Sequence, residues 1–153
     1  MARISTGPLN LDTESIRFDP LPSHLFDETA HLAAKIIASN RDSNKQTQLR
    51  KFYDELCMWN DKVHLAQDKE KVFQDNLPFI RMMNAKIAYA KGRNQKEDKR
   101  DPSVADRTGL IDKNFLDLFG ACIKQVNSSK TLRNFKLFFE AFMGFYKVER
   151  PKD

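Results

Sequence analysis

Residues 76–96 read NLPFIRMMNAKIAYAKGRNQK and combine a helical pattern of apolar residues with an unbalanced positive charge. At about 100° per residue, one side of a helix collects Phe79, Ile80, Met83, Ile87 and Ala90. This spacing predicts a helix that packs against a core. We expect it to begin near Asn76, with Pro78 in the first turn, and to end at Gly92 as a left-handed cap.

The same stretch contains five cations and no acidic residue: Arg81, Lys86, Lys91, Arg93 and Lys96. Solvated helices usually alternate Glu with Lys, because oppositely charged pairs four residues apart stabilise a helix. Opposite the apolar stripe, small residues such as Ala85 and Ala88 leave the backbone approachable, and Tyr89 lies next to Lys86 and Arg93. The pattern predicts an anionic partner, best a polyphosphate backbone bound without reading base sequence. A charged surface that only aids solubility is the alternative.

The composition favours one helical domain. The chain has 153 residues, a net charge of +5 and only five glycines, and Leu, Ile, Phe and Met dominate its apolar residues. The basic excess is compatible with nucleic acid or an acidic membrane surface. Cys57 and Cys122 lack metal-ligand spacing and are expected to be free thiols. No apolar run approaches the length of a membrane span, so we expect a cytoplasmic protein without a membrane partner.

The N-terminal part is expected to hold an arm and two helices. Residues 1–22 show no period and predict an extended arm, with Ile16 and Phe18 docked on a neighbour or on the chain's own core. A first helix is expected over residues 25–39. A capping box formed by Ser43 and Gln46 predicts a second helix from near Asn44. Its apolar stripe is Leu49, Phe52, Tyr53, Leu56, Trp59 or Asn60, and Val63, with expected ion pairs Arg50–Asp54 and Lys51–Glu55.

The C-terminal part predicts a loop and two more helices. Residues 94–109 are polar and contain Pro102 and Gly109, which favours a mobile loop. Asp112 is placed to cap a fourth helix, and Ser128 or Ser129 a last one over residues 131–148. We expect the rings of the last helix in the core: Phe135, Phe138, Phe139, Phe142, Phe145 and Tyr146. The prediction is therefore all-α, a compact bundle of about five helices forming a single domain over residues 23–150.

The sequence contains no recognisable set of catalytic or metal-binding residues. His24, His31 and His64 are scattered, and no Walker A, GxGxxG, GxSxG or HExxH motif is present. Asp101 and Asp106 fall in the loop and form no paired two-metal pattern. We expect no catalytic residue, no metal and no cofactor.

Three blocks resemble a known family. TQLRKFYDEL (residues 47–56), LPFIRMMNAKIAYAKGR (77–93) and NFKLFFEAFMGFYK (134–147) are similar, in order and spacing, to the small subunit of the type III-A CRISPR–Cas effector, the Csm complex. The resemblance covers roughly residues 25–150 and leaves the N-terminal arm and the 94–109 loop without a distinctive match.

The resemblance implies an all-helical, non-catalytic protein present in several copies in one complex. Its implied partners are guide RNA and target RNA, other copies of itself, the backbone subunits that hold the guide, and the large subunit. RNA and DNA cleavage would belong to those other subunits. Since the paired RNA changes with every guide, contacts along it must recognise backbone and shape. The expected phosphate contacts are Arg50, Lys51, Arg81, Lys86, Lys91 and Arg93, with Lys45, Arg133 and Lys136 as further candidates.

Two other functions are compatible with the sequence. A helical protein–protein adaptor would use the basic face to bind an acidic partner. A sequence-specific DNA-binding module would need a short turn between two helices and side chains aimed at base edges, a pattern absent from this sequence.

Overall fold

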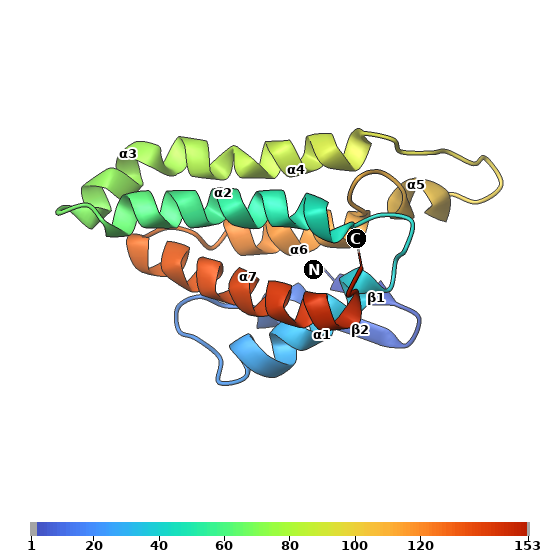
Figure 1. Cartoon of the computed structure of the whole chain (residues 1–153), viewed down its shortest axis with the longest axis horizontal. Coiled ribbons are helices and arrows are strands. Elements are labelled where there is room, and N and C mark those ends of the chain that lie inside the picture. The colour runs from blue at the N-terminus through green and yellow to red at the C-terminus, as the bar shows by residue number, and fades with distance from the viewer. Residues whose placement is uncertain (1–2, 153) are drawn as a thin grey trace.

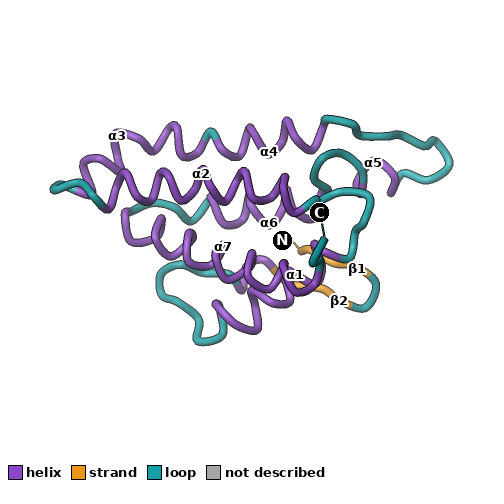
Figure 2. Tube along the Cα trace, in the orientation of Figure 1, coloured by secondary structure: helices purple, strands orange, loops and turns teal. Residues whose placement is uncertain are grey.

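The protein is a helical bundle that carries a small β-hairpin, as seen in a computed structural model that describes residues 3–152 (Figures 1 and 2). The helices of the described chain are a π-helical turn at Leu25–Thr29, α1 (Ala30–Ala38), α2 (Gln46–His64), α3 (Lys69–Arg81), α4 (Met83–Gly92), α5 (Ser103–Arg107), α6 (Lys113–Ile123) and α7 (Ser129–Glu149). Strands β1 (Arg3–Thr6) and β2 (Leu9–Asp12) precede them, followed by a 3₁₀ turn at Thr13–Ser15. The predicted helical bundle is confirmed, with the hairpin as an addition.

The long helices run side by side in layers. In Figure 1, α3 and α4 lie end to end along the top, α2 lies beneath them with α6 behind it, and α7 follows. Helix α1 packs against α7, and the hairpin contacts α1 and α6. Consequently α2 and α3–α4 form one outer layer of the bundle, with their core sides turned toward α6 and α7.

Phenylalanine rings fill the centre between α6 and α7. Phe135 and Phe139 lie with ring centroids 5.2 Å and 6.0 Å from Phe119, and Phe115 lies 6.3 Å from Phe142. The predicted aromatic core of the last helix is confirmed for five rings: Phe135, Phe138, Phe139, Phe142 and Tyr146. The sixth, Phe145, is half-buried and stacks on His31. Burying such rings supplies much of the driving force for folding.

The N-terminal arm is a hairpin, which the sequence did not predict. β1 and β2 are antiparallel, with Ile4 opposite Leu11, and Gly7 takes a φ of 51° at the turn. The side chain of Asn114 on α6 bonds the backbone of Ser5 through its amide and its carbonyl oxygen, at 2.7 Å and 3.4 Å. A strand of four residues has too little alternation of polar and apolar residues to be recognised from the sequence. The hairpin is also held by Asn114, which is distant in the sequence.

Ile16 and Phe18 dock on the chain's own core, the second of the two expected options. Both side chains are fully buried, and Phe18 stacks on Phe135 at 5.4 Å between centroids. The amide of Gln125 accepts from Phe18 N at 3.2 Å, and Asn134 donates to Phe18 O at 2.8 Å. Ile16 and Phe18 therefore pack into the core formed with α6 and α7.

The central helix predicted from Asn76 begins seven residues earlier. Asp68 caps α3 by accepting from Lys71 N at 3.1 Å, so Pro78 lies inside the helix and not in its first turn. The charged residues 69–75 hid this start, because Phe73 is the only fully buried side chain among them. α3 and α4 meet at Met82, which keeps helical φ and ψ of −62° and −20°.

The caps of α2 and α4 also differ from the prediction. α2 begins at Gln46 without a side-chain cap, because the Ser43 hydroxyl donates instead to the carbonyl of Arg107 at 2.7 Å. After α4 the left-handed residue is Asn94, with a φ of 62°, and not Gly92. The caps of α6 and α7 are confirmed, since Asp112 accepts from Phe115 N at 2.9 Å and Ser128 forms a capping box with Thr131.

Candidate nucleic-acid interface

Three of the six main candidate cations share one surface, which we call the α2/α4 face. It consists of two stripes at helical spacing: Lys51, Glu55, Met58, Trp59 and Lys62 on α2, and Phe79, Met82, Lys86, Tyr89 and Arg93 along α3, α4 and its cap. Both stripes lie beside the buried sides of their helices, and they meet across the outer layer. Lys51, Lys86 and Arg93 are the predicted candidates it contains.

Lys86 and Glu55 join the two stripes. The Lys86 ammonium lies 3.1 Å from both oxygens of the Glu55 carboxylate, and Trp59 Nε1 donates to the same carboxylate at 3.1 Å. Glu55 is thus engaged by Lys86 and Trp59, and the predicted Lys51–Glu55 pair is wrong. The Arg50–Asp54 pair is confirmed at 3.6 Å. Lys51 is exposed next to a carboxylate that other groups already neutralise.

Two aromatic residues of the face, Phe79 and Tyr89, are exposed to solvent, and Trp59 is partly buried. Phe79 is 51% exposed and stacks on Trp59, with centroids 6.3 Å apart and planes at 10°. The expectation that Phe79 belongs to the core is therefore wrong: its helical angle places it at the edge of the stripe, beside α2 and short of α6. Ile80, Met83, Ile87 and Ala90 are buried as predicted.

Two cations lie over aromatic rings of this face. The Arg93 guanidinium is 5.9 Å from the centre of the Tyr89 ring, which confirms the expected proximity, and Lys62 Nζ is 5.6 Å from that of Trp59. Tyr89 remains 70% exposed. The face therefore presents rings and cations interleaved at contact distance.

Lys91, predicted as a phosphate contact, lies in the interior. Its ammonium donates to Gln95 Oε1 at 2.8 Å, to the carbonyl of Ala105 at 2.7 Å and to that of Thr108 at 3.0 Å. An ammonium has three donors, and all three are used here. Burial lowers the pKa of Lys91 from its ordinary value, against the attraction of Asp106 and Asp112, which raises it. Lys91 thus anchors the following segment.

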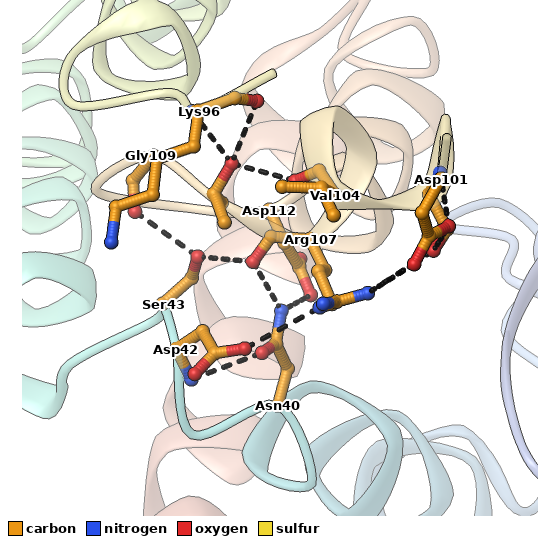
Figure 3. A network of polar contacts seen from close by, with 11 residues as sticks. Asn40, Asp42, Ser43, Lys96, Asp101, Val104, Arg107, Gly109 and Asp112 are labelled. Carbon is orange, nitrogen blue, oxygen red and sulfur yellow. Dashed lines mark hydrogen bonds and ion pairs between the residues drawn. The ribbon is translucent and has the colours of Figure 1, made fainter. Parts of the chain in front are cut away.

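The segment predicted as a mobile loop, residues 94–109, contains α5 and a network of polar contacts (Figure 3). The Arg107 guanidinium lies 3.4 Å from Asp42 and 3.7 Å from Asp101. Asn40 donates to the carbonyl of Arg107 and to the Asp112 carboxylate, both at 2.9 Å. These contacts tie α5 to the α1–α2 connection, which local sequence composition cannot reveal.

The other candidates lie away from the α2/α4 face. Arg50 lies on the side of α2 that borders α7, and Lys136 on α7 pairs with Glu140 at 2.6 Å, which raises the pKa of Lys136. Arg81 donates to the carbonyl of Val126 at 3.3 Å, at the turn between α6 and α7. Lys45 and Arg133 are exposed on separate elements. The structure therefore does not gather all of the predicted cations on one surface.

Asn84 and Ala88, on the side of α4 opposite its core stripe, line a groove of about 900 Å³. Asn84 and Ala88 form one wall, Gly120 and Ala121 of α6 the floor, and residues 13–19 the other wall. Its charged residues have both signs: Glu14, Arg17, Asp19, Asp117 and Lys124. This mixture does not suit a polyanion.

No candidate catalytic or metal centre emerges within residues 3–152. Asp101 accepts from the Ser103 hydroxyl at 2.6 Å, which lowers the Asp101 pKa, and faces Arg107. That part of the chain contains no cluster of three or more potential metal ligands, and none of its helices has the length and hydropathy of a membrane span. Cys57 and Cys122 are free thiols, and burial raises the pKa of Cys122.

Sequence reasoning missed Lys62 and the exposed Met58 and Met82 as members of the face. The signal was present in α2, where Lys51, Glu55, Met58 and Lys62 follow one another at intervals of four, three and four residues. This signal was hard to recognise because Trp59, which lies beside these four residues, also fits the spacing of the buried apolar residues of α2. Only the position of α3–α4 decides which side of Trp59 is covered.

The family comparison agrees with the resemblance noted in the sequence. A family model described as Csm2 Type III-A matches residues 21–152, which leaves residues 1–20, most of the N-terminal arm, and residue 153 outside the match. The searches of curated proteins and of solved structures returned no match. With most of its length matched and a helical fold as expected, the chain belongs to the Csm2 family, the small, structural subunit of the type III-A CRISPR complex.

Proposed function

We propose that this subunit lines the channel that holds the guide RNA–target RNA duplex, contacting the RNA backbone without reading its sequence and bridging neighbouring subunits. The observation that supports this most directly is the α2/α4 face. Its ten residues include four cations, Lys51, Lys62, Lys86 and Arg93, and one acid, Glu55. A surface of this charge attracts a polyphosphate over most of its length.

The arrangement favours backbone contact over base readout. Lys and Arg at helical spacing on an exposed helix pair present point charges along a line, whereas base readout needs amide or guanidinium groups inserted into a groove. Lys86 is held toward Glu55 in this structure, yet its side chain is half exposed and available to a phosphate. The proposed protein partners of this subunit are other copies of the chain, the backbone subunits and the large subunit.

The test uses the assembled complex with two charge-neutralised versions of this subunit. Lys51→Gln with Arg93→Gln removes two cations from the α2/α4 face. Arg50→Gln with Lys136→Gln removes the same charge from the region where α2 borders α7, where each cation already pairs with an acid. Target-RNA capture is measured over a range of salt concentrations with several unrelated guides.

We expect the first version to weaken capture equally for all guides. The log–log salt slope should fall by about 0.7–0.9 for each phosphate that a copy of the subunit no longer neutralises. The matched control should change capture much less. Weaker capture for one guide sequence alone would indicate base readout. If the first version leaves the complex even without RNA, the face binds an acidic protein, and the adaptor function replaces the RNA-holding one.

A further inference from the structure

We propose that the α2/α4 face, besides contacting the duplex backbone, binds unpaired nucleotides, stacking their bases on its aromatic rings while its cations contact the adjoining phosphates. The inference rests on the proposed function, since the ligand is RNA of the same complex, and adds which part of that RNA this subunit holds. Three rings lie on the face: Trp59, Phe79 and Tyr89.

Two of the three rings, Phe79 and Tyr89, are exposed although the bundle has the means to bury aromatics, and Trp59 is partly buried. Phe79 is 51% and Tyr89 70% exposed, whereas the phenylalanines facing α6 and α7 are almost fully buried. Backbone contact alone gives no reason for rings at these positions, because phosphates bind cations and N–H groups. Base–aromatic stacking does give one, and it tolerates any base sequence because every base has a π face.

Cations lie beside two of the three rings, Tyr89 and Trp59. Arg93 is 5.9 Å from the Tyr89 ring centre, Lys62 is 5.6 Å from that of Trp59, and the Lys86 ammonium reaches Glu55, the acid to which Trp59 donates. Successive nucleotides alternate a flat base with a charged phosphate. The face alternates rings and cations in the same way, which is the composition of platforms that bind single strands.

A second copy of the chain fits this face poorly. A two-fold contact would place the same four cations against their copies: Lys51, Lys62, Lys86 and Arg93. Lysine is depleted in the cores of protein interfaces, whereas it makes up three of the ten residues here. Paired RNA fits the rings no better, because its base faces are stacked inside the helix.

The experiment uses Trp59, which is the single tryptophan of the chain and lies at the centre of the face. Its fluorescence is followed while the full-length protein, at low salt, is titrated with single-stranded oligo(A) or oligo(U). An oligonucleotide of the same length with abasic sites has equal phosphate charge and no bases. A duplex of the same length and a polyglutamate complete the comparison.

We expect both base-containing single strands to quench Trp59 and to bind more tightly than the abasic strand, by about 5- to 150-fold for each base stacked. Tyr89→Leu keeps an apolar side chain but removes its π face. It should reduce binding of oligo(A) and leave binding of the abasic strand unchanged. Val148→Ala, at an equally exposed position at the end of α7, is the control and should change neither.

Equal binding of base-containing and abasic strands overturns the stacking inference while the backbone function survives. Absence of quenching at millimolar nucleotide, or equal quenching by polyglutamate, overturns it as well. Fluorescence that changes with protein concentration alone would assign the face to a second copy of the chain. The proposed function fails separately, when neutralising Lys51 and Arg93 leaves RNA capture by the complex unchanged.

Discussion

The ammonium of Lys91, at the end of α4, donates to the carbonyl of Thr108 at 3.0 Å, seventeen residues further along the chain. Close by, the backbone N–H of Leu110 donates to the carbonyls of Ala90 and Arg93, at 3.1 Å and 3.0 Å. A cation that the sequence presents as a ligand contact is thus a structural anchor, and it closes the C-terminal end of α4 against the 94–110 segment.

Replacing Lys91 should therefore lower stability. Lys91→Met leaves the part-buried carbonyl of Ala105 and the buried carbonyl of Thr108 without this donor, and should cost about 1–3 kcal/mol in the free energy of unfolding. Lys86→Met, on the half-exposed surface of the same helix, should cost about 1 kcal/mol or less. Urea denaturation of both variants measures the difference, and equal losses would contradict the buried role of Lys91.

Gly109 is expected to tolerate no side chain. Its φ is 114°, and a Cβ atom there would collide with the carbonyl oxygen of Lys91 and lie 2.9 Å from that of Ile111. Gly109→Ala should destabilise the fold by about 1–3 kcal/mol, because backbone atoms cannot yield as a flexible side chain can. Gly92→Ala, where no heavy atom outside its helix lies within 4 Å, should be neutral or stabilising by up to about 1 kcal/mol. Thermal unfolding of the pair tests the contrast.

The two phenylalanines expected in the core should differ sharply. Phe138 is 2% exposed, so Phe138→Ala should cost about 3–5 kcal/mol. Phe79 is 51% exposed, so Phe79→Ala should cost about 1 kcal/mol, chiefly its stacking on Trp59. Chemical denaturation with unchanged m-values measures both, and a destabilisation at Phe79 as large as that at Phe138 would place its ring in the interior.

Asp112 should make the stability depend on pH. Burial raises its pKa above the ordinary 3.8, although Asn40, the Phe115 N–H, Asn44 and Lys91 each act to lower it. Between 3.8 and the raised value, the folded chain holds this proton more tightly than the unfolded chain, so protonation favours folding. The stability that Asp112 contributes therefore falls as pH rises through this window.

The measurement compares the wild type with Asp112→Asn, which retains an oxygen that can cap α6. The free energy of unfolding of the wild type, minus that of the variant, should decrease as pH rises from about 4 toward neutrality. Asp54→Asn on the exposed side of α2 is the control for general carboxylate effects. A difference that grows with pH would show that the folded state stabilises the Asp112 carboxylate instead.

The sequence by itself determined the helical fold and most of its core, because apolar residues at three- and four-residue spacing must share a buried side. Ile80, Ile87, Phe115, Phe138 and Phe142 follow directly from that periodicity. The caps at Asp112 and Ser128 are also local, since each side chain bonds an N–H three residues away. The family, too, follows from the order of residues along the chain.

Tertiary structure alone decided which charged and aromatic residues are available to a ligand. Lys91 and Lys86 are both lysines on α4, yet one is enclosed by Ala105 and Thr108 while the other reaches the surface at Glu55. Phe79 is half exposed, with Trp59 of α2 stacked on its ring. Helical periodicity gives the direction of a side chain from its own axis, but burial depends on which distant segment packs there, and that information is not local.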